Sequence, residues 1–170
     1  MAQGSAVSDG PKLIFLCGKM TAGKSSLAKE LSREFNAVMF VEDKLLTTLY
    51  PGQMDDIADY IKLSCRVKEA IEDLVCSVLS QGVAVVLDFP GNTINQRQWF
   101  RRLIDRSQSA HELHFIEASN ELCKRQLKDR SRNLPEGAPF STDRDFETVT
   151  AYFQAPLDSE GFKLVVYCRA

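Results

Sequence analysis

The sequence predicts a three-layer α/β/α domain built on a five-stranded parallel sheet. Short apolar segments alternate with longer segments of helical periodicity, which is typical of parallel strands joined by helical crossovers. Several of the apolar segments are hydrophobic at every position, as expected of strands covered by helices on both faces. The chain has 170 residues, 44% of them hydrophobic, so it is long enough for one such domain and short for two.

Five segments are predicted to be strands, and at least five more are predicted to be helices. The strands are 12–17, 37–41, 83–89, 113–118 and 163–168. One helix is predicted after Gly23 and a second at about 56–80. Two more begin at the capping boxes Thr93–Gln96 and Thr142–Asp145, and another begins at Ser119. We therefore expect residues 12–170 to form a single domain. Residues 1–11 lack the basic and apolar regions of a signal peptide and are expected to be a flexible leader.

Composition narrows the possible functions. The formal charge is −2, which disfavours nucleic acid as a partner because the chain has no basic field to hold a polyanion. The five cysteines are scattered without a CxxC pair, which is typical of reduced thiols in a cytoplasmic protein. No segment approaches the roughly 20 apolar residues that a membrane span requires. We expect a cytoplasmic protein without a membrane partner.

A phosphate-binding motif follows the first predicted strand. Residues 18–25 read GKMTAGKS and match the pattern G-x-x-x-x-G-K-[ST] between a strand and a helix. Glycines let backbone N–H groups turn towards a phosphate, and the helix adds its positive end. Lys24 is expected to bind the β- and γ-phosphates of ATP, and Ser25 to coordinate Mg²⁺. The predicted nucleotide site comprises Gly18, Lys19, Met20, Thr21, Ala22, Gly23, Lys24, Ser25 and Ser26.

Two acidic residues stand at the ends of predicted strands, where ligands bind in an open parallel sheet. Asp43 is interpreted as the base that takes a proton from a substrate hydroxyl, or alternatively as the N-cap of a helix beginning near Lys44. Asp88 is interpreted as an acid that holds Mg²⁺, or alternatively as an ordinary strand-end residue. The sequence does not decide which of the two is the base, and Glu42 is a weaker candidate for either role.

Further polar residues are predicted near the substrate. Asn92 follows the third strand, and Arg97 is expected either to contact the substrate or to be solvated. The segment at about 124–141 is rich in cations and then in Gly and Pro, as expected of a lid that excludes water from the transfer. Arg130 or Arg132 is expected to neutralise charge on the transferred group, unless the segment is simply an exposed basic helix.

With these motifs in place, the chain resembles P-loop small-molecule kinases of the AAA_33 type, relatives of chloramphenicol phosphotransferase, zeta toxin and polynucleotide 5′-kinase domains. The resemblance covers about 12–168 and rests on stretches such as GKMTAGKSSLAKEL, VEDKLLTTLYP and VVLDFPGNTINQRQWFR. It implies a P-loop fold with a helical lid, and transfer of the γ-phosphate of ATP, with Mg²⁺, to an acceptor hydroxyl. Lys24 and Ser25 match the family's phosphate and metal residues, Asp43 its acid after the second strand, and Arg130, less closely, a lid arginine.

The chain departs from this family pattern at two places. Its loop carries an unusual lysine, Lys19, which adds a second cation, and Ser26 stands where the family usually has Thr. Asp43 follows Glu42 and lacks the Arg-Asp pairing of polynucleotide kinases, which counts against a nucleic-acid acceptor.

Together these features predict an ATP- and Mg²⁺-dependent phosphotransferase acting on a small-molecule hydroxyl. The predicted catalytic residues are Lys24, Asp43 and Arg130, the substrate residues Asp43, Asp88, Asn92 and Arg97, and the metal ligands Ser25 and Asp88. The alternatives are a nucleotide-dependent switch or adaptor without phosphotransfer, and a kinase of polynucleotide 5′-hydroxyls or nucleotide sugars. The acceptor, the preference for ATP over GTP and the oligomeric state are left open.

Overall fold

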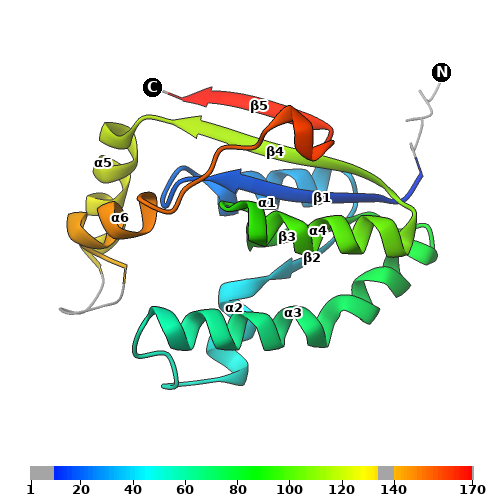
Figure 1. Cartoon of the computed structure of the whole chain (residues 1–170), viewed down its shortest axis with the longest axis horizontal. Coiled ribbons are helices and arrows are strands. Elements are labelled where there is room, and N and C mark those ends of the chain that lie inside the picture. The colour runs from blue at the N-terminus through cyan, green and yellow to red at the C-terminus, as the bar shows by residue number, and fades with distance from the viewer. Residues whose placement is uncertain (1–9, 134–139, 170) are drawn as a thin grey trace, which may run out of the picture.

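A computed structural model describes residues 10–133 and 140–169 of the chain. It contains a five-stranded sheet in which every strand pairs in parallel, in the order β2-β3-β1-β4-β5 (Figure 1). The strands are β1 (Lys12–Gly18), β2 (Val38–Val41), β3 (Val85–Pro90), β4 (Ala110–Ala118) and β5 (Leu164–Arg169). The predicted five-stranded parallel sheet is thus confirmed. The predicted leader at 1–11, apart from its last two residues, lies outside the described residues, as do residues 134–139 of the predicted lid.

Helices connect the strands. They are α1 (Lys24–Glu34), α2 (Glu42–Leu49), α3 (Ile57–Ser80), α4 (Ile94–Ser107), α5 (Asn120–Ser131) and α6 (Asp143–Thr150), with a 3-10 turn at Asp158–Glu160. Both predicted capping boxes are present, at the starts of α4 and α6. In the described ranges, no helix combines the length and the hydrophobicity needed to cross a membrane.

Helix α2 was anticipated only in the alternative interpretation of Asp43, as a helix beginning near Lys44. It begins directly after β2, its N-cap is Val41, and no side chain caps it. The usual start signal of Ser, Thr, Asp or Asn before the first helical residue is therefore missing from the sequence. The helix near Lys44 is confirmed, but Asp43 is not its N-cap, because Asp43 already lies inside the first turn of α2.

Helices cover both faces of the sheet. On one face α3 and α4 pack against residues such as Phe15 and Leu87, and the rings of Phe15 and Phe100 stack with centroids 4.3 Å apart. On the other face α1, α5 and α6 enclose a second cluster around Ile14 and Val86. In Figure 1, α3 and α4 lie in front of and below the sheet, and α1 lies behind it. Burying each such side chain contributes roughly 1.5–3 kcal/mol to the free energy of folding. The helices on both faces therefore stabilise the sheet.

A buried carboxylate joins the strands at the amino edge of the sheet. Glu112 of β4 accepts hydrogen bonds from the Lys12 and Lys163 ammonium groups at 3.0 and 2.9 Å. Its second oxygen lies 3.2 Å from Nε2 of His114. Burial alone would raise the pKa of Glu112, but the two lysines outweigh burial and lower this pKa to about 2. The ion cluster therefore ties β1, β4 and the start of β5 together.

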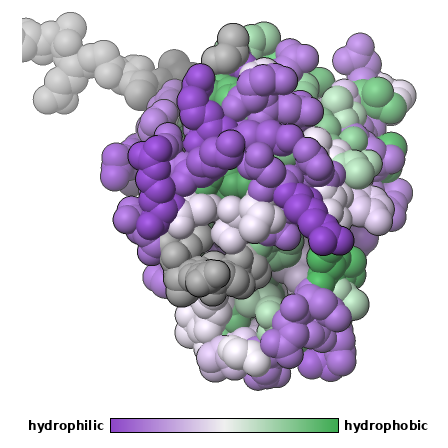
Figure 2. All heavy atoms as spheres, turned by 90° about the vertical axis from the view of Figure 1, so that its left-hand side faces the viewer, coloured by the Kyte–Doolittle hydropathy of each residue, from purple (hydrophilic) through white to green (hydrophobic). Residues whose placement is uncertain are grey.

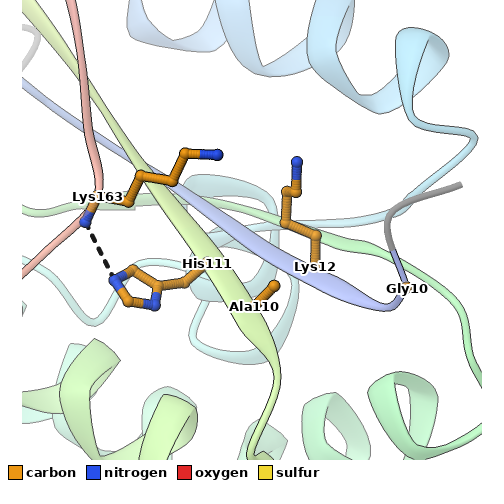
Figure 3. A pocket seen from close by; sticks show the side chains of 5 residues that line it. All are labelled: Gly10, Lys12, Ala110, His111 and Lys163. Atoms are coloured by element: carbon orange, nitrogen blue, oxygen red, sulfur yellow. Dashed lines mark hydrogen bonds between the residues drawn. The ribbon is translucent and has the colours of Figure 1, made fainter. Parts of the chain in front are cut away.

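A cavity of about 410 Å³ opens beside this cluster (Figure 3). It is lined by Gly10, Lys12, Ala110, His111 and Lys163. The two ammonium groups converge in Figure 3, and both are bonded to Glu112. Nε2 of His111 accepts a hydrogen bond from the backbone N–H of Lys163 at 3.2 Å. The cavity lies where β1 and β4 begin, at the edge of the sheet opposite the phosphate motif.

We expect the substitution Glu112→Gln to lower the free energy of unfolding at pH 7 by about 1–3 kcal/mol, because it weakens charge-assisted hydrogen bonds. The pKa of Glu112 is lowered from 4.5, so its stabilisation is complete above pH 4.5 and is lost as the pH falls towards 2. The difference between wild type and variant should therefore shrink over that window. Urea unfolding at several pH values, with the exposed Glu30→Gln as control, measures it, and a pH-independent difference would contradict the assignment.

Candidate active site

The predicted phosphate loop connects β1 to α1 at the carboxyl edge of the sheet. Gly23 caps α1 with φ of 101°, a conformation that favours glycine, and Thr21 is also left-handed at φ 60°. The Lys24 ammonium donates hydrogen bonds to the carbonyls of Gly18 and Lys19 at 2.6 and 2.8 Å. The lysine thus spans the loop from its C-terminal to its N-terminal end. Phosphate oxygens that replace these carbonyls as acceptors would bind the Lys24 ammonium where it already lies.

Lys24 is electrostatically suited to an added anion. Burial lowers the pKa of its ammonium group to about 8, although the nearby Cys17 thiol and Asp88 carboxylate counteract this effect, with smaller contributions from Cys123 and Asp43. A desolvated cation whose partners are mainly carbonyls gains strongly from a charged ligand. The local electrostatics therefore favour binding of a polyphosphate at this loop.

Ser25 and Asp88 lie side by side next to the loop. Asp88 is half-buried on β3 and accepts a hydrogen bond from the Ser25 hydroxyl at the start of α1. Burial raises the pKa of Asp88, the Ser25 hydrogen bond opposes this rise, and the charge of Asp43 adds to it. A hydroxyl and a carboxylate are the oxygen ligands that Mg²⁺ prefers when phosphates and water complete its coordination. The pair therefore fits the predicted metal site.

No fuller metal cluster is present: among residues 10–133 and 140–169, no group of three or more His, Cys, Asp or Glu side chains could hold an ion. A magnesium ion at Ser25 and Asp88 would thus depend on the phosphates of a bound nucleotide for further ligands. This is the usual arrangement for Mg²⁺, which is seldom held by an all-protein cage.

Asp43 lies close to the same group of residues. Val41, the last residue of β2, pairs with Asp88 in the register of the sheet, and Asp43 follows in the first turn of α2. Its charge influences the pKa of both Asp88 and Lys24. Asp43 is exposed, and its carboxylate accepts no hydrogen bond from any residue in the described parts of the chain. The structure thus brings both predicted acids to the phosphate loop and leaves Asp43 accessible.

Lys19, the unusual lysine of the loop, is bonded to oxygens of the protein. Its ammonium donates to the Ala118 carbonyl at 3.1 Å and to Oδ1 of Asn120 at 2.7 Å. It therefore anchors the loop to the end of β4 and the start of α5. The expectation that Lys19 adds a second cation for the nucleotide stays a prediction, and it would require these bonds to be exchanged for phosphate oxygens.

Two contacts of the loop were not anticipated from the sequence. The Thr21 hydroxyl donates to the Cys123 carbonyl at 2.6 Å, and Nη1 of Arg169 lies 3.5 Å from the Ala22 carbonyl. Arg169 is the last residue of β5, and 147 positions separate it from Ala22. No local pattern marks such a residue. Only the knowledge that β5 ends at the same edge as β1 would have indicated it.

Asn92 binds the loop itself. Its Oδ1 accepts a hydrogen bond from the Gly18 backbone N–H at 3.0 Å, and its carbonyl accepts one from the Gln154 N–H at 2.9 Å. Asn92 therefore braces the loop from the turn after β3. Its predicted contact with the substrate stays a prediction, because the described bonds of its side-chain oxygen are to the protein.

Arg97 is fully buried, and its guanidinium is bonded within the protein. Its guanidinium makes a two-pronged ion pair with Glu160 at 2.7 and 2.8 Å and donates to the Gly91 and Gln154 carbonyls at 2.9 and 2.8 Å. The predicted substrate contact would require these bonds to break. The structure instead gives Arg97 the task of holding the segment before β5 against the turn that carries Asn92.

The cations of the predicted lid are mostly paired within α5 and α6. Lys124 binds Glu147 at 2.7 Å, and Arg130 donates to the Phe140 carbonyl at 3.1 Å. Figure 2 looks onto the carboxyl edge of the sheet, where hydrophilic side chains fill the upper part and paler and hydrophobic ones lie below. The action of Arg130 on a transferred phosphate stays a prediction.

Comparison with known proteins places the chain in a family. A model of the AAA_33 family, an AAA domain, matches residues 13–156, so the chain belongs to this family. The predicted resemblance is thereby confirmed. No curated protein gives a significant match.

Solved structures share the fold at low sequence identity. A candidate kinase from Chloroflexus aurantiacus superposes with a TM-score of 0.72 at 16% identity, covering 93% of this chain and 88% of that one. A chain of the PezAT toxin–antitoxin system of Streptococcus pneumoniae gives 0.69 at 18%, covering 94% and 69%. The Mycobacterium tuberculosis APS kinase CysC, solved with AMPPNP and APS, gives 0.62 at 17%, covering 95% and 91%.

We expect Arg97→Met to lower the free energy of unfolding by about 3–5 kcal/mol, because it leaves the partly buried Glu160 without its partner. The exposed Arg102 on the same helix provides the control, and Arg102→Met should change stability by less than about 0.5 kcal/mol. Chemical denaturation of the two variants measures the difference. Equal losses of stability in the two variants would show that the buried ion pair between Arg97 and Glu160 contributes little to the free energy of unfolding.

Proposed function

We propose that the protein is an ATP- and Mg²⁺-dependent phosphotransferase that moves the γ-phosphate of ATP to a hydroxyl of a small molecule. One observation carries the proposal: Lys24, Ser25, Asp88 and Asp43 come together at the carboxyl edge of one parallel sheet. Membership of the AAA_33 family and the shared fold of solved kinases support it. The domain is proposed to comprise residues 12–170.

The nucleotide side of the site is formed by the loop after β1. Backbone N–H groups of the loop and the Lys24 ammonium hold the phosphates, and Lys24 exchanges its bonds to the Gly18 and Lys19 carbonyls for phosphate oxygens. Ser25 and Asp88 would hold Mg²⁺, which supplies positive charge to the phosphate oxygens when bound. Asn92 and Lys19 fix the loop from its two sides.

The acceptor side is assigned to Asp43. Asp88 is hydrogen-bonded to Ser25 and is half-buried, whereas Asp43 is exposed and has a free carboxylate among the described residues. Asp43 takes the proton of the acceptor hydroxyl as the acceptor oxygen bonds to the γ-phosphorus. The bond from that phosphorus to the oxygen bridging it to the β-phosphate breaks, and ADP leaves. Arg130, on the last turn of α5, is proposed to neutralise charge on the transferred group.

The acceptor can be found by incubating the purified protein with γ-labelled ATP, Mg²⁺ and an extract of cell metabolites. Mass spectrometry then follows the label into products, with a Lys24→Ala preparation as the blank. A labelled small molecule that is absent from the blank supports the proposal and names the acceptor. Tight ATP binding without any labelled product would favour the alternative of a nucleotide-dependent switch. Label in added oligonucleotides alone would identify a polynucleotide kinase.

We expect Asp43→Asn to reduce the rate of phosphate transfer at least about 10²-fold, the usual contribution of a general base. ATP affinity should stay within a factor of about two, because Asp43 does not belong to the loop. Single-turnover transfer and equilibrium ATP titration measure the two quantities, with the exposed Asp105→Asn as the control. Unchanged transfer would remove Asp43 from the mechanism.

Lys24→Ala should weaken ATP binding at least tenfold and abolish transfer, because the loop loses the ammonium group that spans it. Arg33→Ala, which removes an exposed basic residue from the same helix, should alter neither measurement appreciably. Calorimetric titration with a non-hydrolysable ATP analogue is the suitable assay. Normal binding by the Lys24 variant would contradict the placement of the phosphates.

A further inference from the structure

Glu42 is a buried carboxylate immediately before the proposed base. Only 2% of its surface is exposed, and its two oxygens accept hydrogen bonds from the Tyr60 and Ser64 hydroxyls at 2.7 and 2.6 Å. The Lys68 ammonium lies 4.0 Å from one oxygen and also faces the ring of Trp99. Tyr60, Ser64 and Lys68 follow one another at four-residue spacing and therefore share one face of α3.

Burying the Glu42 carboxylate costs free energy of folding, so a contribution to stability alone does not explain it. A buried carboxylate loses its hydration, and its neighbour Asp43 carries a like charge. Burial raises the pKa of Glu42, while Ser64, Lys68 and Tyr60 counteract the rise. An apolar residue of similar volume at this buried position would often make the protein as stable or more stable. The presence of a carboxylate at position 42 therefore needs an explanation other than stability.

The start of α2 depends on Glu42 for its position. The helix has only eight residues, and its N-cap Val41 provides no side-chain hydrogen bond. Leu46 anchors the middle of the helix in the core, and the Thr47 hydroxyl bonds the Asp43 carbonyl from within the same helix. In the described chain, the directional side-chain bonds between the first turn of α2 and another element are those of Glu42 to α3.

We propose that Glu42 is a positioning residue, whose bonds to Tyr60 and Ser64 fix the first turn of α2 and so hold the Asp43 carboxylate at the acceptor hydroxyl. The proposal rests on the role of Asp43 proposed above. Two directional hydrogen bonds from a long helix set both the depth and the rotation of that turn, which apolar packing alone would leave free to slide. Glu42 acts only through Asp43 and takes no proton itself.

The test compares Glu42→Ala, Glu42→Gln and the double variant Tyr60→Phe with Ser64→Ala. Glutamine keeps the length of Glu42, and its oxygen can accept from one hydroxyl while its NH2 donates to the oxygen of the other. It is a poor proton acceptor, so Glu42→Gln should retain at least a third of wild-type kcat. Glu42→Ala and the double variant should lose kcat at least tenfold, with KM for ATP unchanged. Glu69→Ala, which removes an exposed glutamate of α3, is the matched control. The double variant keeps Glu42 and serves as the test if Glu42→Ala does not fold.

A second measurement does not depend on activity. Backbone amide exchange over residues 42–46 should be at least tenfold faster in Glu42→Ala and in the double variant than in wild type, and unchanged in Glu69→Ala. If wild type transfers phosphate to no acceptor, the proposed function fails, and exchange alone decides whether Glu42 fixes the turn.

Three results would overturn the inference while leaving the proposed function intact. The first is unchanged kcat in both Glu42→Ala and the double variant. The second is a loss in Glu42→Gln as large as that in Asp43→Asn, which would make Glu42 a proton acceptor. The third is unaltered exchange over residues 42–46.

Discussion

The parallel pairing of β1 with β3 on one side and with β4 on the other is the constraint on which the site depends. It places Gly18 at the end of β1, Asp88 near the end of β3 and Ala118 at the end of β4 along a single edge. The pairing of Val41 with Asp88 then fixes where α2 begins. The chemical groups come from distant parts of the chain, and the register of the sheet makes them neighbours.

Local patterns predicted the parts of the fold that depend on local physics. Strand segments, both capping boxes and the phosphate loop were read from hydrophobic periodicity and short motifs, because each is determined by residues within a few positions. The start of helix α2 was misassigned because its first turn is fixed by bonds from Tyr60 and Ser64 to Glu42, 18 and 22 residues away, and not by a capping residue. A tertiary contact has replaced the local signal there.

The partners of the charged residues were even harder to predict from local sequence. Arg97 and Lys19 were interpreted as surface or ligand cations because of their residue type and position. Their partners are Glu160, 63 residues away, and Asn120, 101 residues away, and no spacing rule connects such pairs. Lys24, Ser25 and Asp88 were expected to be neighbours because they stand near the carboxyl ends of buried strands, and the structure brings them together. The positions of these residues could be predicted where topology supplied the information, and their side-chain partners could not be predicted where burial decided them, while their roles stay predictions.

The contact between Arg169 and the carbonyl of Ala22 has a consequence for biosynthesis. The loop that faces the nucleotide is encoded near the start of the chain, yet β5 supplies one of its neighbours 147 residues later. During synthesis, β1 and the loop leave the ribosome long before β4, α5 and β5 can support them, and pairing between distant strands forms slowly. We therefore expect that a nascent chain becomes competent to bind nucleotide only after β5 has left the ribosome and paired with β4, so that nucleotide binding requires the completed sheet.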